Sequence, residues 1–124
     1  FFITHVKKED QIQRVGITYS DRFMPYMEML YKSVNARFMF DINQSGAVGY
    51  TSRFLEAVMY NKRFITDNIS VKDTKYYTTG NIFYYEKIED IRKDFFDNSK
   101  ADYGYKGEFS PINLILQIDK ELSK

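Results

Sequence analysis

The sequence has no cysteine and a single histidine, and each scarcity excludes a class of site. Without cysteine the chain forms neither disulfides nor thiolate metal sites, and nothing in it indicates an oxidising compartment. The lone histidine, His5, excludes any site that needs two imidazoles. His5 ends the first apolar segment, where a structural or solvent-facing role is more common than a catalytic one.

Long apolar runs and a charge imbalance are also absent. No stretch approaches the roughly 18 apolar residues of a membrane-spanning helix, and no basic segment followed by an apolar one marks a signal peptide. The net charge of +1 disfavours binding to nucleic acid or to anionic membrane. We also expect no metal site, because Glu86, Glu89 and Asp90 continue into a charged segment and are typical of a solvated helix face.

The composition that remains is that of a globular protein. The chain has 124 residues, 44% of them hydrophobic and 28% charged, which suits one domain with one core. We therefore expect residues 1–124 to form a single domain. The sequence opens with Phe1-Phe2-Ile3, which reads as a strand already under way, so we expect the chain to be a piece of a longer protein.

Short apolar runs alternate with segments of helical periodicity. Strands are expected at residues 1–6, 15–19, 37–42, 63–66 and 81–85, and helices at 24–34, 51–60, 88–96 and 111–122, the last capped by Ser110. This order predicts an α/β fold with a Rossmann-like parallel sheet flanked by helices on both faces. Ligands of such sheets bind beyond the carboxyl ends of the strands, which here are the loops after Ile42 and Thr66.

The loop after Ile42 has the chemistry of a phosphate site. Gly46 and Gly49 let the backbone approach a ligand closely. The helix that follows begins near Thr51, and its N–H groups and dipole favour an anion. Glu56 lies about one turn further on, where its carboxylate can accept hydrogen bonds from both hydroxyls of a ribose. Asp41, at the end of the preceding strand, is expected to orient the loop rather than to touch the ligand.

The segment from Asp41 to Asp67 resembles the signature region of GT-B glycosyltransferases. The matching parts are Phe54-Leu55-Glu56-Ala57, then Asn61-Lys62-Arg63, then Phe64-Ile65-Thr66. More narrowly, the chain is similar to bacterial transferases that build surface polysaccharide and lipopolysaccharide. That likeness rests on Phe40-Asp41-Ile42-Asn43-Gln44, Ser45-Gly46, Thr51-x-Arg53-x-x-Glu56-Ala57, Tyr19-Ser20, Met24-Pro25-Tyr26 and Asn81-Ile82-Phe83, and it extends from about residue 16 to residue 96.

The resemblance implies a partial C-terminal domain of a GT-B enzyme, which binds the nucleotide-sugar donor. The whole enzyme would transfer the sugar to a bacterial glycan or lipid-linked acceptor held by a domain outside this chain, and this chain alone would be inactive. The implied location is the cytoplasm, or the inner face of the cell membrane as a peripheral protein. No cofactor is implied beyond the donor, which is a substrate.

The resemblance also assigns the donor-binding residues, with Glu56 at the ribose and the loop at the diphosphate and sugar. They are Ser45, Gly46, Gly49, Tyr50, Thr51, Arg53 and Glu56. No catalytic residue is assigned. Many retaining GT-B enzymes carry a second acidic residue eight positions before the ribose glutamate, and here Val48 takes that place. The alternative is a non-catalytic flavodoxin-like module that binds a nucleotide or a partner.

Three further expectations concern side chains outside the loop. Lys62 and Arg63 are expected to interact with the carboxyl end of the preceding helix, where positive charge is favourable. One tyrosine of each adjacent pair, Tyr76-Tyr77 and Tyr84-Tyr85, should lie in the core. Tyr103 and Tyr105 are expected to pack across the sheet edge.

Overall fold

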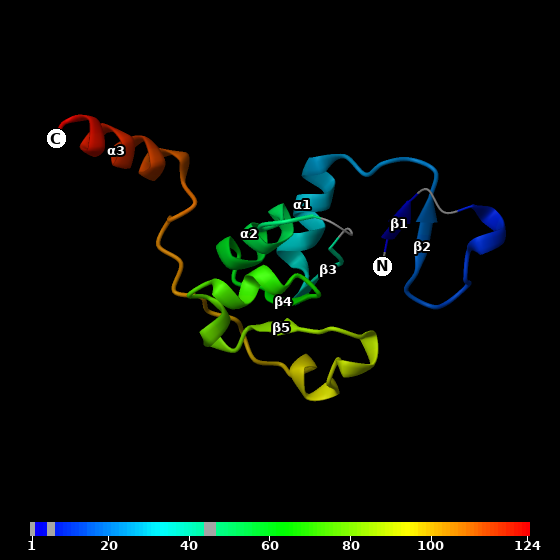
Figure 1. The fold of residues 1–124 in the computed structure, drawn as a ribbon. Coiled ribbons are helices and arrows are strands. Elements are labelled where there is room, and N and C mark those ends of the chain that lie inside the picture. The colour runs from blue at the N-terminus through cyan, green and yellow to red at the C-terminus, as the bar shows by residue number, and fades with distance from the viewer. Residues whose placement is uncertain (1, 5–6, 44–46) are drawn as a thin grey trace. The chain divides into compact units, whose positions relative to one another are not determined.

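The chain forms two compact units, residues Phe1–Ser33 and Val34–Lys124. The computed structural model describes residues 2–4, 7–43 and 47–124 (Figure 1). Every strand pair in this described part is parallel. The expected α/β class and its parallel strands are therefore confirmed, while His5 lies outside the described residues.

The first unit contains two short strands and most of a helix, whose last two residues belong to the second unit. Strand β1 (Phe2–Thr4) pairs with β2 (Thr18–Ser20), and a 3-10 turn at Lys8–Asp10 lies between them in sequence. Helix α1 (Tyr26–Asn35) follows Pro25, whose carbonyl accepts the Met29 N–H. The amphipathic stripe expected for this helix is not buried, since Met27 is 71% exposed.

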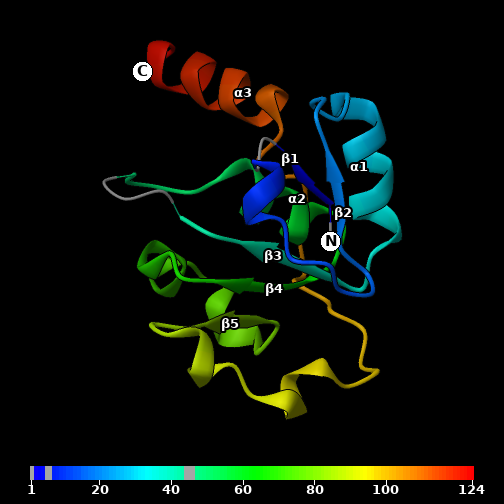
Figure 2. The ribbon, with the colours of Figure 1, turned by 90° about the vertical axis from the view of Figure 1, so that its right-hand side faces the viewer.

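The second unit is built on a three-stranded sheet in the order β3-β4-β5 (Figure 2). Its elements are β3 (Phe38–Asp41), α2 (Ser52–Met59), β4 (Arg63–Thr66), β5 (Ile82–Tyr84) and α3 (Pro111–Leu122). Strand β4 and helix α3 have the predicted bounds, and β3, α2 and β5 differ from prediction at their ends. A small parallel sheet with helices is consistent with the expected Rossmann-like arrangement.

Strand β4 is buried along its whole length because both faces of the sheet are covered. On one face Phe64 packs with Phe54 and Val58 of α2. On the other face Ile65 packs with Tyr85 and Phe95. A central strand of a parallel sheet is covered on both faces, so all four of its residues are buried, rather than every second one.

The tyrosine pairs behave as expected, with one ring of each in the core. Tyr76 is buried and Tyr77 is partly exposed, while Tyr85 is buried and Tyr84 is partly exposed. Tyr76 lies in a turn rather than a strand, beside the 3-10 helix Tyr77–Thr79.

The helix expected at residues 88–96 is wrong. Two 3-10 turns, Ile88–Asp90 and Lys93–Phe96, replace it, and Ile91 between them has an extended backbone with ψ 113°. A continuous helix would have placed Ile88, Ile91 and Phe95 on one buried face. Instead Ile88 is exposed, and the break at Ile91 lets the Phe95 ring turn against Phe83, with ring centroids 5.3 Å apart.

The turn from α2 into β4 depends on Asn61. This residue has φ 51°, in the left-handed region. Glycine adopts that conformation most readily, and asparagine is one of the few other residues that tolerate it. The N–H of Asn61 donates to the Val58 carbonyl and that of Lys62 to the Ala57 carbonyl, which together form a Schellman motif. The chain therefore reverses in three residues, and β4 returns beside β3.

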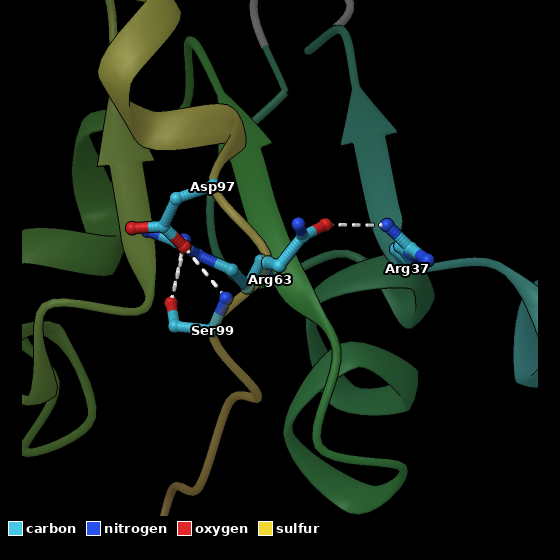
Figure 3. A network of polar contacts seen from close by, with 5 residues as sticks. Arg37, Arg63, Asp97 and Ser99 are labelled. Carbon is cyan, nitrogen blue, oxygen red and sulfur yellow. Dashed lines mark hydrogen bonds and ion pairs between the residues drawn. The ribbon is translucent and has the colours of Figure 1, made fainter.

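Arg63 lies at the start of β4 and does not interact with the end of α2, so that expectation is wrong for Arg63. Its side chain is only 8% exposed, and its guanidinium lies 4.0 Å from the centre of the Phe95 ring. It donates to Asp97 at 2.5 Å and to the Ser99 hydroxyl at 2.9 Å (Figure 3). A buried cation requires such partners.

A second arginine extends this network to β3. Arg37, directly before that strand, donates to the Asn98 side chain at 2.7 Å (Figure 3). The segment 97–99 is thereby tied to the amino ends of two neighbouring strands. The sheet edge opposite the predicted ligand site is consequently occupied by a structural ion pair and hydrogen bonds.

Tyr103 joins the amino ends of β4 and β5. Its hydroxyl oxygen lies 2.8 Å from the Lys62 carbonyl and 3.2 Å from the Asn81 carbonyl, so the two carbonyls share its one proton, and its N–H donates to the Asn61 side chain. Burial raises the pKa of this hydroxyl, so it stays protonated as a donor. The expectation that Tyr103 packs across the sheet edge is confirmed, whereas Tyr105 packs against Phe109 with the two rings tilted.

The final helix, α3, begins with Pro111 in its first turn, as expected. Ser110 does not cap it through its side chain, and instead the Ser110 carbonyl accepts the N–H groups of Asn113 and Leu114. Every residue of α3 is exposed, including the apolar residues whose spacing predicts the helix, Leu114, Ile115, Ile118 and Leu122. Among the described residues, no helix combines the length and apolar character needed to cross a bilayer.

The bond between Tyr103 and the two carbonyls makes the first prediction. Tyr103→Phe should lower the free energy of unfolding by about 1–2 kcal/mol, because two partly buried carbonyls lose the donor that they share. Urea denaturation followed by circular dichroism measures the change. Tyr60→Phe removes the same atom from a ring that is 37% exposed, and should change the stability by less than about 0.5 kcal/mol. Equal effects of the two variants would contradict the account.

The hydrogen bonds and the ion pair of Asp97 predict that the stability of the fold depends on pH. Hydrogen bonds from Ser99, followed by the Arg63 charge, hold the pKa of Asp97 below its ordinary value of 3.8. The ionised carboxylate therefore stabilises the fold above that value, and the contribution is lost as the pH falls below it. Asp97→Asn should be less stable than the parent at neutral pH, and the gap should shrink towards about pH 2. A gap that is independent of pH would contradict the role given to Asp97.

Candidate functional site

The carboxyl ends of the three parallel strands gather a group of polar side chains. Asp41 ends β3, Asp67 and Asn68 follow β4, and Tyr85 follows β5. Burial, and then the charges of Asp67 and Asp41, raise the pKa of the Tyr85 hydroxyl. This is the edge at which parallel α/β sheets bind their ligands.

Helix α2 begins at this edge, and Thr51 caps it. The Thr51 side chain accepts the Phe54 N–H at 3.2 Å and donates its own proton to Asp41 Oδ2 at 2.8 Å. A hydroxyl has one proton to give and lone pairs to accept with, so both bonds form together. Asp41 thus orients the loop through a hydrogen bond, as expected from the sequence.

Gly49 precedes the cap and is held by Asn68. Its backbone has φ 94°, which glycine adopts without strain, and its carbonyl accepts the Asn68 side-chain N–H at 2.8 Å. Asn68 is 4% exposed and also accepts the Ser70 N–H at 3.0 Å. The short amide therefore connects the β3–α2 loop to the 3-10 helix Ile69–Asp73.

A third contact ties the start of the loop to β4. The Asn43 N–H donates to Asp67 Oδ1 at 2.6 Å, and the Asn43 side chain donates to the Ala47 carbonyl at 3.2 Å. Asp41, Asp67 and Asn68 thus hold the described parts of the loop on both sides of residues 44–46. We call these three residues the edge anchors.

The predicted ribose ligand, Glu56, is buried and paired. Its carboxylate lies 3.1 Å from Arg53 Nη1 across one helical turn, and its side chain is 8% exposed against 28% for Arg53. Arg53 therefore lies on the solvent side of the pair. A ribose that reaches Glu56 must displace or share the Arg53 contact.

The structure brings together four of the predicted site residues with the start of α2. They are Gly49 and Thr51 before its first residue, and Arg53 and Glu56 within its first turns. Tyr50 packs against Phe54 in a tilted arrangement, with ring centroids 5.2 Å apart. Ser45 and Gly46 lie outside the described residues.

Two residues of this edge, Asp67 and Asn68, were not singled out from the sequence. The carboxyl-end rule did select the loop after Thr66, which contains both. Nothing in the local sequence indicated that the side chain of Asn68 would turn back to Gly49, 19 positions earlier.

Among residues 2–4, 7–43 and 47–124, no three acidic or histidine side chains group as metal ligands would. No family model matches the chain, and neither does any curated protein or solved structure.

The Thr51 cap gives a prediction about α2. Thr51→Val keeps the shape of the side chain but loses both hydrogen bonds, and should reduce the free energy of unfolding by about 1–2 kcal/mol. Thr51→Ser retains the hydroxyl and should cost much less. Guanidinium denaturation of the two variants beside the parent measures this. Equal losses for valine and serine would show that the hydroxyl does not hold the helix.

Proposed function

We propose that this chain is the donor-binding part of a glycosyltransferase that moves a sugar from a nucleotide-sugar to a bacterial glycan or lipid-linked acceptor. The nucleoside diphosphate binds at the carboxyl edge of the three-stranded sheet. The acceptor and the catalytic acid or base are supplied by a part of the enzyme outside this chain.

One observation carries the proposal: helix α2 starts at the carboxyl edge with its first residue, Ser52, three positions after Gly49, whose backbone has φ 94°. Helix N-termini attract anions through their N–H groups and dipole. Arg53 lies in the first turn and adds a positive charge that is partly exposed. A departing diphosphate gains negative charge during transfer, and this arrangement stabilises that charge.

The nucleoside is assigned to Glu56. A carboxylate accepts both hydroxyls of a ribose, and each charge-assisted bond contributes about 1.5–3 kcal/mol. Glu56 follows the start of the helix by about one turn, which separates the phosphate and ribose contacts along one element. The Arg53 side chain then moves from the carboxylate towards the phosphate, in exchange for the ribose hydroxyls.

The same pair supports the alternative of a binding module without transfer chemistry. Glu56 is 6% exposed and already holds Arg53 at 3.1 Å, so the pair also suffices as a structural contact within α2. In that case the helix start binds a phosphate-bearing partner, and Glu56 has no role in choosing it. The two hypotheses differ in whether the ribose is recognised.

Calorimetric titration with uridine, guanosine, cytidine and thymidine diphosphates tests the proposal. One of them should bind saturably and more tightly than inorganic pyrophosphate. Glu56→Gln keeps the shape of the side chain but removes its charge. It should lower the affinity for that nucleotide by about tenfold or more, while the affinity for pyrophosphate is unchanged or higher.

Glu121→Gln is the matched control, because that glutamate is 61% exposed on α3. It should leave every affinity unchanged, and circular dichroism should show that each variant is folded. Equal binding of all diphosphates and pyrophosphate, unaffected by Glu56→Gln, would favour the alternative. Absence of binding by any of them would contradict the donor site in this chain.

A further inference from the structure

We infer that Asp41 and Asn68 are positioning residues, which hold the Gly49–Thr51 backbone so that the start of α2 can receive the diphosphate. The inference rests on the proposed function. Neither residue needs to touch the ligand. Each acts through one hydrogen bond to the loop, and the two bonds come from the ends of neighbouring strands.

Asp41 acts through the Thr51 hydroxyl. That hydroxyl rotates freely, and donation to Asp41 Oδ2 at 2.8 Å fixes its proton. Its lone pairs then face the Phe54 N–H at 3.2 Å. The order of the helix start therefore depends on a carboxylate that belongs to the preceding strand.

Asn68 acts on the backbone of Gly49, two residues before Thr51. Its side-chain N–H donates to the Gly49 carbonyl at 2.8 Å, and its oxygen is occupied by the Ser70 N–H at 3.0 Å. The backbone N–H of Asn68 is itself held by Thr66 Oγ1 at 3.0 Å. The amide is thus fixed in orientation before it reaches Gly49, and the Gly49 carbonyl is directed towards it.

The sign of the effect at Asp41 separates positioning from simple charge. A carboxylate beside a diphosphate repels it, so removal of the charge alone strengthens binding. Loss of the Thr51 bond has the opposite effect, because the helix start is no longer held in the receptive geometry. Small displacements of positioning groups cost large factors in such sites.

The test compares Asp41→Ala with Asp41→Asn, using the preferred nucleoside diphosphate and inorganic pyrophosphate as probes in calorimetry. Asp41→Ala should weaken both probes by about tenfold in spite of the lost negative charge. Asp41→Asn keeps an oxygen that accepts from Thr51, and should restore binding to the parental level or above. Binding by Asp41→Ala that equals or exceeds that of the parent would overturn the inference.

Asn68 is tested against a residue with the same chemistry at the other end of the sheet. The Asn81 side chain also donates to a backbone carbonyl, that of Asp102 at 3.0 Å. Asn68→Ala should weaken both probes about tenfold, whereas Asn81→Ala should leave their affinities unchanged. Equal effects of the two variants would overturn the role given to Asn68.

Hydrogen exchange distinguishes failure of this inference from failure of the proposed function, because it needs no ligand. The Phe54 and Leu55 N–H groups donate to the Thr51 side chain and carbonyl. Their exchange should be faster by about tenfold in Asp41→Ala and Asn68→Ala, and unchanged in Asn81→Ala. Nucleotide binding without these exchange changes would overturn the positioning roles. The exchange changes without nucleotide binding would support the anchoring of the loop and contradict the donor site.

Discussion

The second unit depends on covering both faces of one short strand, β4. Its four residues are buried, with Phe64 and Ile65 pointing into separate apolar clusters. Because the strand is completely covered, its backbone is satisfied only by β3 and β5, which fixes the parallel register of all three. The buried Arg63 at its start and the Tyr103 hydroxyl beside it close the amino edge with polar contacts.

The two edges of the sheet consequently differ. The amino edge is occupied by the Arg63–Asp97 ion pair and by hydrogen bonds to the segment 97–103. At the carboxyl edge the edge anchors instead hold a loop and the start of a helix. Short polar side chains at strand ends suit this task, because they reach neighbouring backbone groups at little entropic cost. The proposed donor site lies at the carboxyl edge, where the start of α2 is located.

The sequence predicted the local elements well where one signal dominated. The bounds of β4 and the Pro111 start of α3 follow from a β-branched and aromatic run and from proline chemistry. The prediction of a helix over residues 88–96 was wrong because Phe95 packs against Phe83 of the sheet. That tertiary contact prevails over the helical periodicity of the segment. Arg63 was misread for the same reason, since its partners Phe95 and Asp97 lie more than 30 positions away. The role of Asp41 was predictable, whereas that of Asn68 required the fold.

The central claim is that the start of α2 receives a nucleoside diphosphate, and an amide chemical-shift titration tests its location most directly. With an isotope-labelled chain and the tightest of the four diphosphates, the account predicts saturable shifts for Gly49 to Glu56 and for Asp67 and Asn68. Residues at the amino edge, such as Ser99 and Tyr103, should not move. Shifts centred on the amino edge or on α3, with the start of α2 unaffected, would contradict the account.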